Sequence, residues 1–255
     1  MMTNDLYNYA PFFEKVLYRA CKNYIRESVT AVEYRHIFGC VFDDDHNIIP
    51  LEQEIEIFVR TQKIIQQRFP LFQMKIIVCG LKIVGIPHVQ AQIDAYMAAD
   101  KITNMVTGFD MVCEEDYNPK CDDFLEVLYT AKLKYGDRFK VIMHAGESYQ
   151  RSNTELFDAV LLDSKRIGHG FNLIMHPKLL DIVKEKDMCL ECCPVSNKVL
   201  GYVTDMRLHP VRSLLQKGVA VSINSDDHGF WHARGVTLDY LIAYLEWGLD
   251  LADMK

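Results

Sequence analysis

Long hydrophobic runs, flexible linkers and an excess of basic residues are all missing from this chain of 255 residues. No apolar run approaches the roughly 18 residues that a membrane-spanning helix needs, so we expect no membrane partner. No stretch rich in proline, glycine or serine interrupts the chain, so we expect one domain over residues 1–255. The net charge of −7 makes the chain a poor ligand for the phosphates of nucleic acid, and we expect no nucleic-acid partner.

Two further features are also lacking: a secretory signal and a disulfide framework. The first residues, Met-Met-Thr-Asn-Asp-Leu, carry neither a basic segment nor a following apolar segment, so the chain as written predicts no secretion. The eight cysteines are spread along the chain, mostly within apolar runs, which is typical of free buried thiols. Cys189 and Cys192 spell C-x-x-C, but side chains three apart on a strand point to opposite faces, so we expect no chelating pair.

What the chain does contain is a regular alternation of short apolar runs with segments of helical periodicity. The expected strands cover residues 31–37, 74–81, 105–112, 139–143, 164–167, 188–193 and 220–223. The expected helices cover 9–27, 50–69, 88–99, 122–135, 154–162, 176–186, 210–217 and 237–249.

This alternation predicts an α/β fold built from parallel strands. The candidate strand ends recur every 25 to 31 residues from Cys113 to Asp226, which is the length of one strand–helix unit. Length and spacing favour a (β/α)8 TIM-type barrel. Seven strands are one too few for closure and the chain opens on a helix, so the first strand is missing. An open seven-stranded α/β sheet is the alternative.

Three polar clusters each close one of these apolar runs. They are His144-Ala145-Gly146-Glu147, the segment 166–170 (Arg-Ile-Gly-His-Gly) and the segment 224–227 (Asn-Ser-Asp-Asp). The carboxyl ends of parallel strands are where a barrel enzyme places its reactive side chains, so we expect one shared site. Imidazole and carboxylate suit a catalytic zinc ion, and Glu147 would be an acid or base beside the metal.

At these residues the chain resembles the metal-dependent deaminases of the adenosine deaminase family, and within that family the secreted adenosine deaminase-related growth factors. The three clusters in this order form a specific signature. Further similar segments extend the resemblance over nearly the whole chain: residues 9–13, 32–35, 108–112, 115–116 and 193–197. AMP deaminases share parts of the signature, but Pro194-Val195-Ser196-Asn197 and the loop after Val112 look more like the nucleoside enzymes.

The resemblance implies a metal-dependent hydrolase barrel that deaminates adenosine or 2′-deoxyadenosine to the inosine product and ammonia, with Zn²⁺ as cofactor. It implies a purine nucleoside as partner, a homodimer as the candidate assembly and an extracellular location, although the chain shows no signal peptide.

Carried over to this chain, the resemblance also implies a role for each site residue. His144 and Asp226 would ligate zinc, and Asp226 would also orient the attacking water. Glu147 would bind the purine and donate a proton to N1. His169 would orient the water and stabilise developing charge. Asp227 would hydrogen-bond N7, and the backbone N–H of Cys113 would contact N3.

Three departures from the family pattern bear on these roles. No His-x-His, which supplies two further zinc ligands in the family, occurs in the chain. Cys113 stands where the family has glycine. His228 stands where a proline is expected after the aspartate pair, and His228 or His232 could in principle reach a metal.

We therefore expect a barrel truncated at its N-terminus and also at its C-terminus, with weak zinc binding and weak or no deaminase activity in residues 1–255. The alternative function is a catalytically impaired deaminase-fold binding protein, or a growth-factor-like protein. A third reading is another amidohydrolase barrel acting on a different ring. Zinc deaminases that flip bases use H-x-E with P-C-x-x-C, and this chain contains neither in usable form.

Overall fold

The computed structural model describes residues 4–233 and 235–253. Its contacts divide the chain into two compact units, Met1–Asp110 and Met111–Lys255. The expectation of one domain over residues 1–255 stays a prediction. Within the described residues, no helix combines the length and the apolar character needed to cross a membrane.

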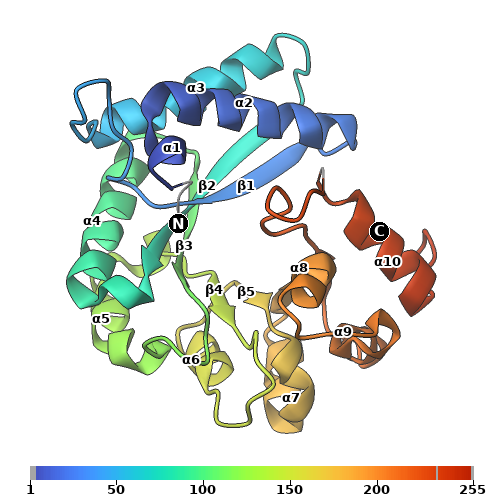
Figure 1. Cartoon of the computed structure of the whole chain (residues 1–255). Helices are drawn as coiled ribbons and strands as arrows, with labels where there is room; N and C mark the ends of the chain where they lie inside the picture. Colours follow the sequence, from blue (N-terminus) through green and yellow to red (C-terminus); the bar gives the residue numbers. More distant parts are fainter. Residues whose placement is uncertain (1–3, 234, 254–255) are drawn as a thin grey trace. The chain divides into compact units, whose positions relative to one another are not determined.

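The first unit is built around a sheet with the strand order β1-β2-β3. β1 (Ala31–His36) pairs in parallel with β2 (Gln73–Leu81), with Ala31 opposite Gln73, and β3 (Val106–Val112) follows. The helices are α1 (Asn4–Asn8), α2 (Ala10–Arg26), α3 (Leu51–Gln66) and α4 (Ile86–Ile102), with the 3-10 turn η1 at Lys82–Val84 (Figure 1). The consecutive residues Ile76, Ile77 and Val78 of β2, whose side chains alternate between the two faces, are all buried, as expected for a parallel strand that is covered on both faces.

The second unit contains a four-stranded parallel sheet with the order β4-β5-β6-β7. The strands are β4 (Met143–Ala145), β5 (Arg166–His169), β6 (Cys189–Cys192) and β7 (Val221–Ile223). The α-helices are α5 (Leu125–Tyr135), α6 (Glu155–Leu161), α7 (Pro177–Glu185), α8 (Pro194–Val199), α9 (Pro210–Gln216) and α10 (Thr237–Trp247). The 3-10 helices are η2 (Cys121–Phe124), η3 (Gly136–Arg138), η4 (Phe171–Met175) and η5 (Met206–Leu208).

The register of this second sheet brings its polar residues to one edge. Ala145 pairs with His169 and Cys192 pairs with Ile223, so four strands end nearly level. Because the strands are parallel, the segments that follow them leave from the same edge. That edge therefore carries all three polar clusters predicted from the sequence.

Seven strands are present in the described residues, as predicted, but they pair as two sheets, so a single open sheet of seven strands is not observed. Two strands lie later than expected. The strand predicted at 139–143 is β4 at Met143–Ala145, and the one predicted at 164–167 is β5 at Arg166–His169. Both shifts have one cause. The prediction took the buried apolar run as the strand, whereas backbone pairing includes His144, Gly168 and His169, which follow the apolar run. Helix α8 was not predicted.

Candidate active site and metal centre

The candidate site lies at the carboxyl ends of the strands in the four-stranded sheet, which we call the carboxyl edge of the sheet. His144 lies within β4, Glu147 follows that strand, His169 is the last residue of β5, and Asp226 follows β7. The ring centroids of His144 and His169 are 5.0 Å apart. The structure thus brings these predicted residues together, although it does not test the role of each.

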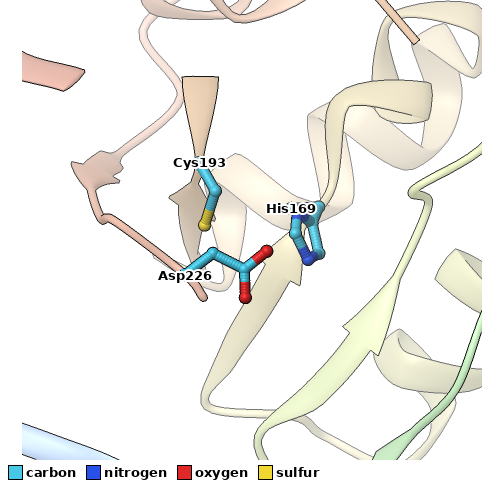
Figure 2. A group of neighbouring side chains, drawn as sticks. All are labelled: His169, Cys193 and Asp226. Carbon is cyan, nitrogen blue, oxygen red and sulfur yellow. The ribbon is translucent and has the colours of Figure 1, made fainter. Parts of the chain in front are cut away.

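Three donor atoms converge at this edge. One ligand atom each from His169, Cys193 and Asp226 lies within 4.8 Å of the other two. Figure 2 shows the Asp226 carboxylate between the Cys193 sulfur and the His169 ring. Imidazole nitrogen, thiolate sulfur and carboxylate oxygen are all established zinc ligands, so the chemistry of this group fits a metal ion.

The metal-donor group differs from the ligand set predicted from the sequence. Asp226 was predicted as a ligand and His169 as its neighbour, whereas Cys193 appeared only inside the segment 193–197. His144 is not a member of the group, and its role as a ligand stays a prediction. Among the described residues, His228 and His232 belong to no such group either.

Glu147 lies beside these donors in a mostly buried position. Its Oε1 accepts a hydrogen bond of 3.0 Å from Asn197 Nδ2 and lies 3.2 Å from His169 Nδ1. Burial is the largest influence and raises the pKa of Glu147 to about 8, opposed by the charge of His144 and reinforced by Asp226. Glu147 is therefore protonated at neutral pH, which is the state required of a general acid.

Asn197 is fixed in turn by a buried histidine that the sequence analysis did not identify. The backbone N–H of Val211 donates to His209 Nδ1 over 3.2 Å, so in the neutral ring the proton lies on Nε2. Nε2 then donates to Asn197 Oδ1 over 3.1 Å, and this orients the amide nitrogen toward Glu147. Burial lowers the pKa of His209 to about 4, which keeps the ring neutral.

The loop after β4 is held by Glu115. This buried carboxylate accepts hydrogen bonds from the backbone N–H groups of Gly146 (2.9 Å) and Glu147 (3.1 Å) and from Asn153 Nδ2 (3.0 Å). The next residue, Asp116, accepts from Ser148 Oγ over 2.6 Å. The sequence contained Glu115-Asp116 as a point of resemblance, but no local pattern indicated that it binds a loop 31 residues away.

Three of the residues assigned to the site have a strained backbone. His169 has φ 60°, Asp226 has φ 49° and Cys113 has φ 139°, all in the region that favours glycine. Cys113, half-buried after β3, thus has a glycine-like backbone at the position where the resemblance expects glycine. Asp227 is exposed beside Asp226, and nothing tests the predicted purine contacts of Asp227 and Cys113.

A glycine also shapes the position of His144. Gly168 pairs with His144 across β4 and β5, and a Cβ added at Gly168 would lie 3.2 Å from His144 Cγ. This contact is tighter than normal van der Waals packing. The absence of a side chain at residue 168 therefore lets the His144 ring approach β5.

Comparison with known proteins gives one consistent family. The family model for adenosine deaminase matches residues 7–255. Adenosine deaminase 2 of Dictyostelium discoideum is 32% identical over 99% of this chain and 48% of its own length. Adenosine deaminase 2 of Homo sapiens is 30% identical over 99% of this chain and 50% of its own length. The chain therefore spans about half the length of the curated relatives it matches.

Solved structures add a likeness of fold. An amidohydrolase from Burkholderia ambifaria with bound zinc has a TM-score of 0.83 at 18% identity, over 99% of this chain and 68% of its own. The N6-mAMP deaminase of Arabidopsis has a TM-score of 0.77 at 15% identity, over 94% of this chain and 70% of its own. At these identities the likeness concerns the fold alone. It confirms the predicted class, an α/β deaminase-type barrel, here with seven strands in the described residues.

Proposed function

The chain belongs to the adenosine deaminase family, and from this premise we propose that it performs the zinc-dependent hydrolytic deamination of adenosine and 2′-deoxyadenosine. The observation that carries the proposal is Glu147, a carboxyl group whose pKa is raised to about 8 by burial beside a group of metal donors. A protonated carboxyl at that place is suited to make a purine ring carbon electrophilic by protonating N1.

The family and the zinc-bound neighbour both point to a metal ion, and zinc is our proposal for this chain. His144 and Asp226 are its predicted ligands, and His169 and Cys193 are the further donors at the same edge. When bound, zinc lowers the pKa of a water molecule toward neutrality and so supplies a nucleophile for the purine C6.

The chain's own residues direct the proton. Asn197 Nδ2 and His169 Nδ1 both approach Oε1 of Glu147, which leaves Oε2 to carry the acidic hydrogen. Oε2 would then donate its proton to N1 as the oxygen of water adds at C6. Of the two protons of that water, one would pass to the amino group, which leaves as ammonia to give the inosine product, and the other would restore the proton of Glu147. Asp227 would hydrogen-bond N7 and the Cys113 N–H would contact N3, which fixes the orientation of the ring.

Glu147→Gln tests the proposal because it retains the shape of the side chain and removes the acid. With zinc supplied, we expect deamination of adenosine to slow by at least ~10²-fold, the usual cost of losing acid–base catalysis. Glu126→Gln is the matched control, since Glu126 is an exposed carboxylate on α5. Unchanged production of inosine by Glu147→Gln would reject the assignment, and faster turnover of AMP or N6-methyl-AMP than of adenosine would reject the nucleoside as substrate.

A deaminase-fold protein that binds purine nucleosides without turnover is the second candidate. It is favoured by the lack of a His-x-His segment in this chain. Calorimetric titration with adenosine separates the two: binding without formation of inosine supports this candidate. The homodimer is likewise a proposal, for which sedimentation velocity is the measurement.

A further inference from the structure

The sulfur of Cys193 is the unexpected member of the metal-donor group. We propose that Cys193 binds the metal ion directly, as a thiolate, in one site with His169 and Asp226. The inference rests on the proposed function only in that a metal ion belongs to this site. It concerns which atoms of this chain hold the ion.

The separations of the donor atoms suit a single ion. Zinc bonds of about 2.0 Å to nitrogen and oxygen and about 2.3 Å to sulfur place tetrahedral donors roughly 3.3–3.6 Å apart. The three atoms already lie within 4.8 Å of one another, so movement of about 1 Å closes the group. Asp226 is the donor best able to move, because it is exposed on the loop that follows β7.

The surroundings of His169 support a ligand role for its ring. Nδ1 lies 3.2 Å from Glu147 Oε1 and 3.4 Å from Asn197 Nδ2, so its partner follows from the tautomer of the ring: an Nδ1–H would donate to Glu147, whereas a bare Nδ1 would accept from Asn197. A histidine that binds a metal characteristically donates its other ring N–H to a carboxylate or carbonyl oxygen, which fixes the ring and its tautomer. Metal binding through Nε2 requires the tautomer with hydrogen on Nδ1, and in that tautomer Glu147 also orients the ring.

The position of Cys193 in the chain explains why this thiol, and not its neighbours, meets the metal. β6 ends at Cys192, and Cys193 is the next residue and the one that precedes α8, so it lies at the carboxyl end of the strand. Cys192 is fully buried within the strand, and Cys189 lies at the strand's opposite end. Neither belongs to the group of donors.

Charge and exposure are also consistent with a metal ion. One thiolate and one carboxylate neutralise a divalent cation, while the thiol proton passes to solvent as the ion binds. Cys193 and His169 are 6% and 3% exposed, and Asp226 is exposed. These three donors leave one tetrahedral position, which either His144, the ligand predicted from the sequence, or a water molecule would fill.

Cobalt substitution tests the proposal without reference to activity. The protein is stripped with a chelator and titrated with Co²⁺ alone. Thiolate ligation produces an intense sulfur-to-cobalt charge-transfer band in the near ultraviolet, and we expect this band at one equivalent. Cys193→Ser should abolish the band and weaken binding at least about tenfold. Cys189→Ser is the matched control, a half-buried thiol at the start of β6 that lies outside the group, and it should leave the band unchanged.

X-ray absorption on the zinc-loaded natural sequence keeps the proposal testable even if Cys193→Ser fails to fold. One sulfur at about 2.3 Å upholds the proposal, and a shell of nitrogen and oxygen alone overturns it. The outcome is separable from deaminase activity. A sulfur ligand in a protein that does not deaminate adenosine would reject the proposed function only, and deamination with no sulfur ligand would reject the proposal on Cys193 only.

Discussion

Two buried side chains on either side of Asn197 have pKa values displaced in opposite directions. Burial raises the pKa of Glu147 to about 8 and lowers that of His209 to about 4. Both shifts keep the side chain neutral at pH 7. A neutral His209 can accept from Val211 and donate to Asn197 at once, and a neutral Glu147 has a proton to donate, so the same burial produces an oriented amide and an acid.

The raised pKa of Glu147 predicts a definite dependence of stability on pH in the metal-free protein. Between the ordinary value of 4.5 and about 8, the folded state holds a proton that the unfolded chain has released. This contribution is fully present below pH 4.5 and is lost as pH rises through about 8. In urea titrations over this range, we expect the unfolding free energy of the natural sequence to fall relative to that of Glu147→Gln, by up to about 1.4 kcal/mol per pH unit.

His209 titrates in both proteins of this comparison, so its effect cancels in the difference. Parallel pH curves for the natural sequence and Glu147→Gln would show that the pKa of Glu147 is not raised by folding.

The positive φ of Cys113 predicts that glycine is better tolerated there than cysteine. A non-glycine residue in this region costs about 1–3 kcal/mol, while the greater freedom of an unfolded glycine costs about 0.5–1 kcal/mol. We expect Cys113→Gly to raise the unfolding free energy by about 1 kcal/mol in denaturant titration. Cys40→Gly is the control, because Cys40 is also half-buried but has no positive φ, and it should lower the unfolding free energy.

Among the elements, α10 has three buried residues, Asp239, Ala243 and Trp247, and an exposed apolar side. Trp247 is 3% exposed, donates from Nε1 to the Met206 carbonyl over 2.9 Å, and its ring lies 5.2 Å from that of His209. Leu245, on the same helix, is 69% exposed. Trp247 therefore holds the end of the helix, while Asp239 at its start accepts a hydrogen bond of 2.9 Å from the backbone N–H of Val195. The Trp247 ring supports the histidine that positions Asn197.

This asymmetry predicts unequal effects of two alanine substitutions on α10. Trp247→Ala should lower the unfolding free energy by about 3–5 kcal/mol, since it leaves a large cavity and an unpaired carbonyl. Leu245→Ala should change it by less than about 0.5 kcal/mol. Thermal and denaturant unfolding of both variants are the measurements, and equal effects would contradict the packing seen here.

The elements that the sequence predicted best are the ones with long uniform patterns. The pattern predicted a helix at 50–69 and a strand at 74–81, and α3 and β2 begin and end within three residues of these bounds. The prediction failed at β4 and β5, where functional polar residues occupy the strand ends and interrupt the apolar run. Helix α8 has six residues and begins with proline, too short for its periodicity to be read.

The residues of the candidate site also divide into those that the sequence predicted and those that it did not. His144, Glu147, His169 and Asp226 were predicted, because each follows or ends an apolar strand and the clusters recur at regular spacing. His209 and the contacts of Asn197 were not, since the bond from Asn197 to Glu147 spans 50 residues and depends on tertiary packing. Cys193 was likewise not predicted as a ligand. Its place beside the other donors depends on β6 ending level with the neighbouring strands, which is a property of the folded sheet.

At the scale of the whole molecule, the metal-donor group belongs to one unit. His169, Cys193 and Asp226 all lie within Met111–Lys255. A ligand that binds only the folded state stabilises it by about 2.7 kcal/mol at one hundred times its dissociation constant. That stabilisation should fall on the unit that supplies the donors.

We therefore expect zinc to slow hydrogen exchange in one unit only. At that concentration, amide exchange in β4 to β7 should slow by up to ~10²-fold while exchange in β1 and β2 stays unchanged, as measured by mass spectrometry. Cys193→Ser is the control and should show less protection. Equal slowing in both units would contradict the prediction and favour one cooperative domain over residues 1–255.

The order of the strands has a consequence for how the chain is made. In β4-β5-β6-β7, each strand pairs with the one that precedes it in the sequence. Successive strands begin 23 to 32 residues apart, which a ribosome translates in roughly one to six seconds. Helix formation and local chain closure take microseconds or less. Each strand can therefore pair with its neighbour while the next is still being synthesised, and the metal centre, which needs Asp226 beyond β7, is completed last.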